Sequence, residues 1–256
     1  MMGLIEPRAE FAVFADTGWE RKGTYEYLDY LDMCAAEYGF PPILRVQAGD
    51  IRKDTIDAVN GAVDLPFYTD TGSKSGGKLN RQCTGPYKIE VVKREVRRIF
   101  GMVHRVQWIG FSMDEISRRN DNTHPKYITP RYPLLELRYD RAACERWFIE
   151  NNHAIPVKSS CIGCPLMGKD IVKQMKERYP EEFEERCEFD EKIRKKSPVP
   201  KRKDIVQLTL PGVDVPKPSF DLFVDDSRIP QRDVDFSKVP DEPDPMQDEC
   251  QGGCHL

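Results

Sequence analysis

The alternation of apolar and polar residues divides most of the chain into short strands and amphipathic helices. Apolar runs typical of buried strands occur at residues 10–15, 42–46 and 106–111. Helical spacing of apolar residues occurs at 24–38, 51–59, 86–100, 140–151, 170–179 and 180–195. Strands that alternate with helices predict a parallel sheet, so we expect an α/β fold.

The composition changes at residue 197. Nine of the twenty prolines lie between Pro198 and Pro245, together with many aspartates. We therefore expect one domain at 1–196 and a proline-rich, extended tail at 197–256. The tail ends in a group formed by Cys250, Cys254 and His255.

Length, charge and cysteine content narrow the class of protein. The chain has 256 residues, which suits one large domain with or without an appendage, and its net charge of −4 gives no general attraction to nucleic acid or anionic membranes. It has no run of eighteen apolar residues and no apolar signal-peptide core, so we expect no membrane partner. Eight cysteines without a secretory signal predict a reducing compartment, hence a cytoplasmic protein with metal or redox chemistry.

Cys161 and Cys164 form a Cys-x-x-Cys motif, a spacing that lets two thiolates share one metal ion or cluster corner. The same spacing also occurs in redox dithiols. Cys83 and Cys144 bring the number of available thiols to four, and thiolates favour zinc or an iron–sulfur cluster. A second grouping omits Cys83 and joins the motif to Cys250, Cys254 and His255.

Polar residues follow two of the predicted strands, at the positions where open α/β sheets bind ligands. Asp16, Thr17 and Gly18 come directly after the first strand, and Ser112 begins the segment after the third. Ser112 with Glu115 three residues later is also typical of a helix N-terminal capping box.

Taken in order, the motifs resemble those of phosphoadenosine phosphosulfate (PAPS) reductase-like proteins, members of the adenine nucleotide α-hydrolase superfamily. The motifs are Asp16-Thr17-Gly18, Arg81-Gln82-Cys83-Thr84 with Lys88, Gly110-Phe111-Ser112-Met113-Asp114-Glu115 with Arg118, Tyr132-Pro133-Leu134 and Cys161-Ile162-Gly163-Cys164-Pro165. The resemblance covers about residues 11–180. It implies a Rossmann-like α/β/α sandwich with a mostly parallel sheet.

The resemblance also implies ligands and residue roles. Family members bind ATP or a sulfonucleotide, and some carry a four-iron, four-sulfur cluster on a cysteine pair followed by a distant Cys-x-x-Cys. The implied nucleotide-binding residues are Asp16, Thr17, Gly18, Arg81, Lys88, Ser112, Glu115 and Arg118. The implied cluster or zinc ligands are Cys83, Cys144, Cys161 and Cys164. A reductase would use Cys250 or Cys254 as the thiolate nucleophile.

The chain departs from the family pattern in three places. The family's phosphate loop and its strand precede the Asp16 motif, whereas this chain has nine residues ahead of that strand, so we expect a sandwich that lacks the first strand. Gln82-Cys83 stands where cluster-bearing reductases have tandem cysteines, and Ser112 stands where they have arginine. The C-terminal cysteines match the reductase tail only loosely.

These residues predict an adenine-nucleotide enzyme of sulfur or adenylyl-transfer chemistry with an iron–sulfur or zinc site. The alternative is a non-catalytic, zinc-stapled module. The expected partner is a small-molecule nucleotide. A nucleic-acid or protein acceptor and a homodimer are left open.

Overall fold

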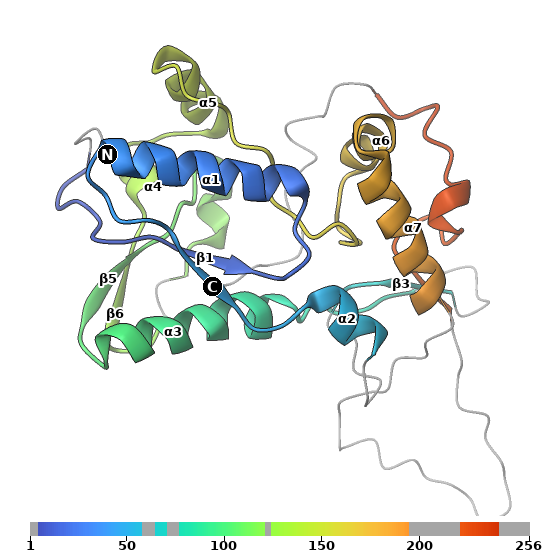
Figure 1. The fold of residues 1–256 in the computed structure, drawn as a ribbon, viewed down its shortest axis with the longest axis horizontal. Coiled ribbons are helices and arrows are strands. Elements are labelled where there is room, and N and C mark those ends of the chain that lie inside the picture. Colours follow the sequence, from blue (N-terminus) through green and yellow to red (C-terminus); the bar gives the residue numbers. More distant parts are fainter. Residues whose placement is uncertain (1–4, 58–64, 71–76, 121–123, 195–220, 241–256) are drawn as a thin grey trace, which may run out of the picture.

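The computed structural model describes residues 5–57, 65–70, 77–120, 124–194 and 221–240. It shows a mixed α/β fold with short parallel strand pairs, as expected from the sequence (Figure 1). No helix in these ranges is long and apolar enough to cross a membrane.

The first parallel pair is a strand–helix–strand unit. Strands β1 (Val13–Asp16) and β2 (Leu44–Gln47) are parallel, and α1 (Lys22–Glu37) connects them. Helix α3 (Glu90–Phe100) packs against both strands, and Figure 1 shows α1 and α3 on opposite sides of β1. The predicted strands and the helix between them are confirmed.

Helix α3 is preceded by an irregular turn. The predicted helix at 86–100 begins instead as a π-helical turn, η1 (Gly85–Ile89), which runs directly into α3. Such π-turns are often found at functional sites.

The second parallel pair consists of β5 (Arg105–Trp108) and β6 (Ile128–Arg131). Short helices and the predicted helix near 140–151 follow these strands along the chain: η2 (Met113–Arg118) after β5, and α4 (Pro133–Glu136) and α5 (Arg141–Glu150) after β6. The two parallel pairs are separate sheets, so β1 and β5 each have one edge without a partner strand among the described residues. Val106 of β5 is 53% exposed, although parallel sheets are normally covered on both faces.

A third, antiparallel sheet joins distant parts of the chain in the order β4–β3–β7. Strands β3 (Tyr68–Asp70) and β4 (Gly77–Lys78) lie in a region for which the sequence indicated no strand, and β7 (Asp221–Phe223) lies in the expected tail. The extended-tail prediction is therefore wrong for residues 221–240, which we call the C-terminal segment.

The C-terminal segment is part of the main hydrophobic core. Leu222, Val224, Val234 and Phe236 are buried there. They share the core with α2 (Ile51–Ile56), α6 (Lys169–Arg178) and α7 (Pro180–Ile193), and η3 (Gln231–Asp233) also contacts α7. The burial of these apolar side chains offsets the conformational entropy that is lost when this proline- and aspartate-rich segment becomes ordered.

Candidate functional site

The turn that follows β1 forms the first part of the candidate site. The carboxylate of Asp16 accepts hydrogen bonds from the backbone N–H of Gly18 (2.7 Å) and the hydroxyl of Tyr25 (2.9 Å). Gly18 has a φ of +75°, and a Cβ atom there would lie 2.5 Å from Nε2 of Gln47. Burial, assisted by Asp16, raises the pKa of Tyr25, so its hydroxyl remains a donor. Asp16 therefore orders the turn that presents Thr17.

Four side chains from three segments meet beside this turn. Glu20 Oε1 accepts a hydrogen bond from Thr17 Oγ1 (3.0 Å) and lies 3.7 Å from Nζ of Lys88 in η1. Cys161 Sγ lies 3.2 Å from Thr17 Oγ1 and 3.8 Å from Glu20 Oε1. The Glu20 side chain is fully buried, and its Oε2 has no hydrogen-bond partner among the described residues. We call Thr17, Glu20, Lys88 and Cys161 the Glu20 cluster.

The Glu20 cluster combines a charged pair with a protonated thiol. Burial opposes the charge of Lys88, but Glu20 and then Cys161 offset this effect and raise the pKa of the ammonium. Arg81, another predicted nucleotide-binding residue, lies near Lys88 and slightly lowers its pKa by charge repulsion. Burial, together with Glu20, raises the pKa of Cys161 far above its usual range, so its thiol keeps its proton near neutral pH.

Backbone contacts bring the Cys-x-x-Cys motif to the end of β1. Glu20 and Cys161 form an isolated antiparallel bridge, and the N–H of Ile162 donates to the carbonyl of Trp19 (3.1 Å). The N–H of Cys164 donates to the carbonyl of Cys161 (3.0 Å), which closes a tight turn. We call residues 161–164 the cysteine turn.

Three of the predicted metal ligands lie in one neighbourhood. Cys83 is half-buried at the start of η1, where its carbonyl accepts the N–H of Tyr87 (3.1 Å). Burial raises the pKa of Cys164, and Cys83 adds to this effect because it lies close by. Three soft thiols suit zinc or an iron–sulfur cluster in their chemistry. Within the described ranges, however, no three cysteine, histidine or carboxylate side chains are arranged to hold a metal ion.

Cys144 is not brought to the other thiols. It lies on α5, where burial and the neighbouring Asp140, Asp114 and Glu145 raise its pKa. The fourth ligand predicted from sequence is thus displaced, because α5 lies against α1, where its Trp147 and Phe148 line a pocket together with Tyr30. Cys250, Cys254 and His255 lie outside the described residues.

The predicted nucleotide-binding residues after β5 form a separate group. Arg118 pairs with Glu115 and lies over the ring of Phe111, 4.6 Å from its centroid. Ser112 Oγ donates to Asp114 (3.3 Å) and makes no side-chain cap, so the capping box is not formed. No hydrogen bond or ion pair between described residues joins this group to the Glu20 cluster.

The N-terminus of α1, a place where α/β proteins often bind phosphate, is occupied by a side chain. Glu182 of α7 accepts a hydrogen bond from the backbone N–H of Lys22 (2.7 Å) and pairs with Arg21 (3.3 Å). A carboxylate thus satisfies this helix end from within the protein.

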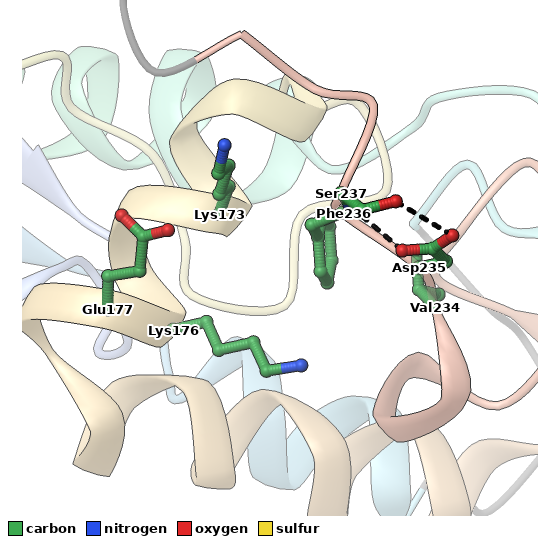
Figure 2. Close-up of a pocket in the computed structure, with 7 residues that line it drawn as sticks. All are labelled: Lys173, Lys176, Glu177, Val234, Asp235, Phe236 and Ser237. Carbon is green, nitrogen blue, oxygen red and sulfur yellow. Dashed lines mark hydrogen bonds between the residues drawn. The ribbon is translucent and has the colours of Figure 1, made fainter.

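A cavity of about 500 Å³ lies away from all of these groups, between α6 and the C-terminal segment (Figure 2). Nζ of Lys173 donates to the carbonyl of Val239 (2.7 Å), and Nζ of Lys176 lies 5.4 and 5.5 Å from the rings of Phe183 and Phe236. None of the predicted site residues lines this cavity. Its volume alone therefore does not identify it as the site.

Sequence reasoning missed two residues that organise the site. Glu20 follows the Asp16 motif closely, and an acidic residue so near a strand end was a signal for it. Arg186 lies in the middle of a charged helix, where no local pattern distinguishes it from exposed neighbours.

Comparisons with protein-family models, with curated proteins and with solved structures find no match.

Proposed function

We propose that the chain binds an adenine nucleotide beside the end of β1 and performs sulfur or adenylyl-transfer chemistry there. The Glu20 cluster supports this proposal most directly. It gathers a hydroxyl, a carboxylate, an ammonium and a thiol where parallel strands end, which is where open α/β sheets bind ligands. The resemblance to PAPS reductase-like proteins points to the same place.

In this proposal Thr17 and Gly18 contact the nucleotide, and Lys88 and Arg81 bind its anionic groups. Lys88 is about one-third exposed, so its ammonium can exchange Glu20 for a phosphate oxygen at the surface. Oε2 of Glu20, which lacks a partner, would then accept a hydrogen bond from a ligand hydroxyl or amine. Ser112, Glu115 and Arg118 would contribute from the second parallel pair.

The unpaired edges of β1 and β5 support the further proposal that a Rossmann-like sheet lacks a strand between them. A phosphate loop carried by such a strand would supply backbone amides for the phosphates. In this proposal the phosphate contacts come from the side chains of Lys88 and Arg81, so phosphate binding depends on side chains.

We therefore expect this chain to bind ATP weakly, with a dissociation constant on the order of 1 mM. Lys88→Gln removes a charged donor and should weaken binding about tenfold. Isothermal titration at low salt measures both values. Lys93→Gln is the matched control, because Lys93 lies on α3 and pairs with Glu90 instead. A low-micromolar dissociation constant that Asp16→Ala leaves unchanged would contradict this binding site.

A second candidate function, a non-catalytic zinc-stapled module, is favoured by one observation. The positive groups that would meet a phosphate are already neutralised, Lys88 by Glu20 and the N-terminus of α1 by Glu182. In a protein that binds no anion, these internal contacts can stay intact. An enzyme that binds a phosphate would have to break them first.

Metal content separates the two possible sets of metal ligands, the set that includes Cys83 and the set that uses the C-terminal cysteine group. We expect Cys83→Ser to lose most of any zinc or iron bound by the wild type, because Cys83 lies near the cysteine turn. Cys144→Ser is the control and should keep the metal, since Cys144 lies on α5. Anaerobic purification with metal analysis and absorbance spectra provides the measurement. Metal that persists in Cys83→Ser and disappears in Cys250→Ser would assign the site to the C-terminal cysteine group.

A further inference from the structure

Arg186 of α7 is the largest fully buried side chain among the described residues. Nη1 of its guanidinium donates to the carbonyls of Ile162 (2.8 Å) and Cys164 (3.1 Å), both in the cysteine turn. The opposite side of the guanidinium faces the C-terminal segment. There Nε donates to Oε1 of Gln231 (2.8 Å), and Nη2 donates to the carbonyl of Val224 (3.4 Å).

All four acceptors of Arg186 are neutral oxygens. Burial lowers the pKa of the guanidinium. The negative charges of Asp225 and Asp190 partly oppose this effect, but neither carboxylate forms a hydrogen bond with Arg186. A buried charge without a bonded counter-ion is costly, and an apolar side chain of similar size would fill the same space at a lower cost. Packing alone therefore does not explain an arginine at this position.

The geometry of arginine does explain it. A guanidinium presents five N–H donors in a rigid, planar fork, so one side chain can hold acceptors from separate segments in fixed relative positions. Here the acceptors are the turn that carries Cys161 and Cys164 and the two ends of the 224–231 stretch. The fork therefore fixes the backbone at both thiols of the turn.

We propose that Arg186 is the positioning residue of the cysteine turn, and that Gln231 and the carbonyl of Val224 hold Arg186 in place. The C-terminal segment then sets the orientation of the two thiols through Arg186. This inference rests on the proposed function only for the chemical role of Cys161 and Cys164. It concerns their backbone geometry and not the nucleotide.

The test measures the alkylation of individual cysteines in the reduced full chain, by iodoacetamide and mass spectrometry, without nucleotide. Arg186→Lys keeps the charge but lacks the fork, and Gln231→Leu removes one acceptor without changing α7. In each variant we expect Cys161 and Cys164 to react about tenfold faster relative to Cys187, the change expected when one or two hydrogen bonds are lost. Cys187 is buried on the same helix and reports general loosening.

Arg232→Lys is the matched control, because Arg232 also joins the C-terminal segment to α7 but binds exposed Glu184 and Glu191. Lysine keeps the positive charge that lowers the pKa of the reference thiol Cys187. This variant should leave the ratio unchanged. An unchanged ratio in both Arg186→Lys and Gln231→Leu would overturn the proposal, as would an equal increase at Cys187 in both. If Arg186→Lys does not fold, Gln231→Leu alone decides. A chain that binds no nucleotide gives the same readout, so failure of the proposed function is seen separately.

Discussion

Gly163→Ala is expected to lower the free energy of unfolding by about 3 kcal/mol or more. A Cβ atom at position 163 would overlap the indole ring of Trp19 and lie 2.8 Å from Cδ1 of Phe189. Both rings are buried in the main core and pack edge to face, 4.6 Å apart. Neither ring can move without displacing the other, so the cysteine turn would have to shift outward. Urea unfolding followed by circular dichroism measures the loss.

Gly85→Ala is the matched control for this prediction. Gly85 lies in the π-helical turn, and a Cβ atom there would meet nothing within 4 Å. We expect a change between zero and a gain of about 1 kcal/mol, because alanine restricts the unfolded chain. Equal stability of Gly163→Ala and the wild type would show that the indole of Trp19 leaves room for a Cβ atom at position 163.

Asp190→Ala is expected to destabilise the protein by about 3 kcal/mol and to release the C-terminal segment. The buried carboxylate of Asp190 accepts the backbone N–H groups of Val224 (3.1 Å) and Gln231 (3.0 Å). It also accepts a hydrogen bond from Arg194 (2.6 Å). Without it, two buried N–H groups lose their acceptors, and each costs about 1–3 kcal/mol.

Limited proteolysis between residues 221 and 240 should accelerate in Asp190→Ala. Asp190→Asn keeps one acceptor oxygen and should lose about half as much stability. Glu191→Ala, next along the helix but exposed, should change stability by less than about 0.5 kcal/mol. A segment equally resistant to protease in Asp190→Ala and the wild type would contradict its attachment through this side chain.

The sequence predicted both strands of the first parallel pair, strand β5 of the second and the longer helices because their signals are local, whereas it gave no signal for β6. Periodic apolar residues mark α1, α6 and α7, and α5 begins at a typical capping residue, Asp140, whose carboxylate accepts the N–H of Ala143 (2.6 Å). Such features depend on neighbours within a few residues. The mixed α/β class is confirmed for the same reason, whereas the Rossmann-like sandwich stays a proposal.

The third sheet and the C-terminal segment could not be predicted because their partners lie far apart in the sequence. Tyr68 pairs with Lys78 on one side and with Phe223 on the other, and no short window contains both contacts. The apolar residues near 222 and 236 are few and stand among prolines and aspartates. Their burial depends on α7, which the local pattern does not reveal.

For the candidate site, too, local signals were predictable from the sequence and contacts between distant residues were not. The resemblance pointed to Thr17 and Lys88 and the Cys-x-x-Cys spacing to Cys161 as site residues, and the structure brings the three together. The spacing did not show that Glu20 joins them, nor that Cys144 lies apart, because both facts depend on how α1 and α5 pack.

The pairing of β3 with β7 sets an order of events while the chain is being made. The ribosome releases β3 and the cysteine turn well before it releases β7 and Gln231. Until residues 224–231 emerge, Arg186 lacks two of its acceptors, and Cys161 and Cys164 sit on a backbone that is not yet fixed. We therefore expect the two thiols to reach their final positions only after Gln231 has emerged, later than the strands and helices around them.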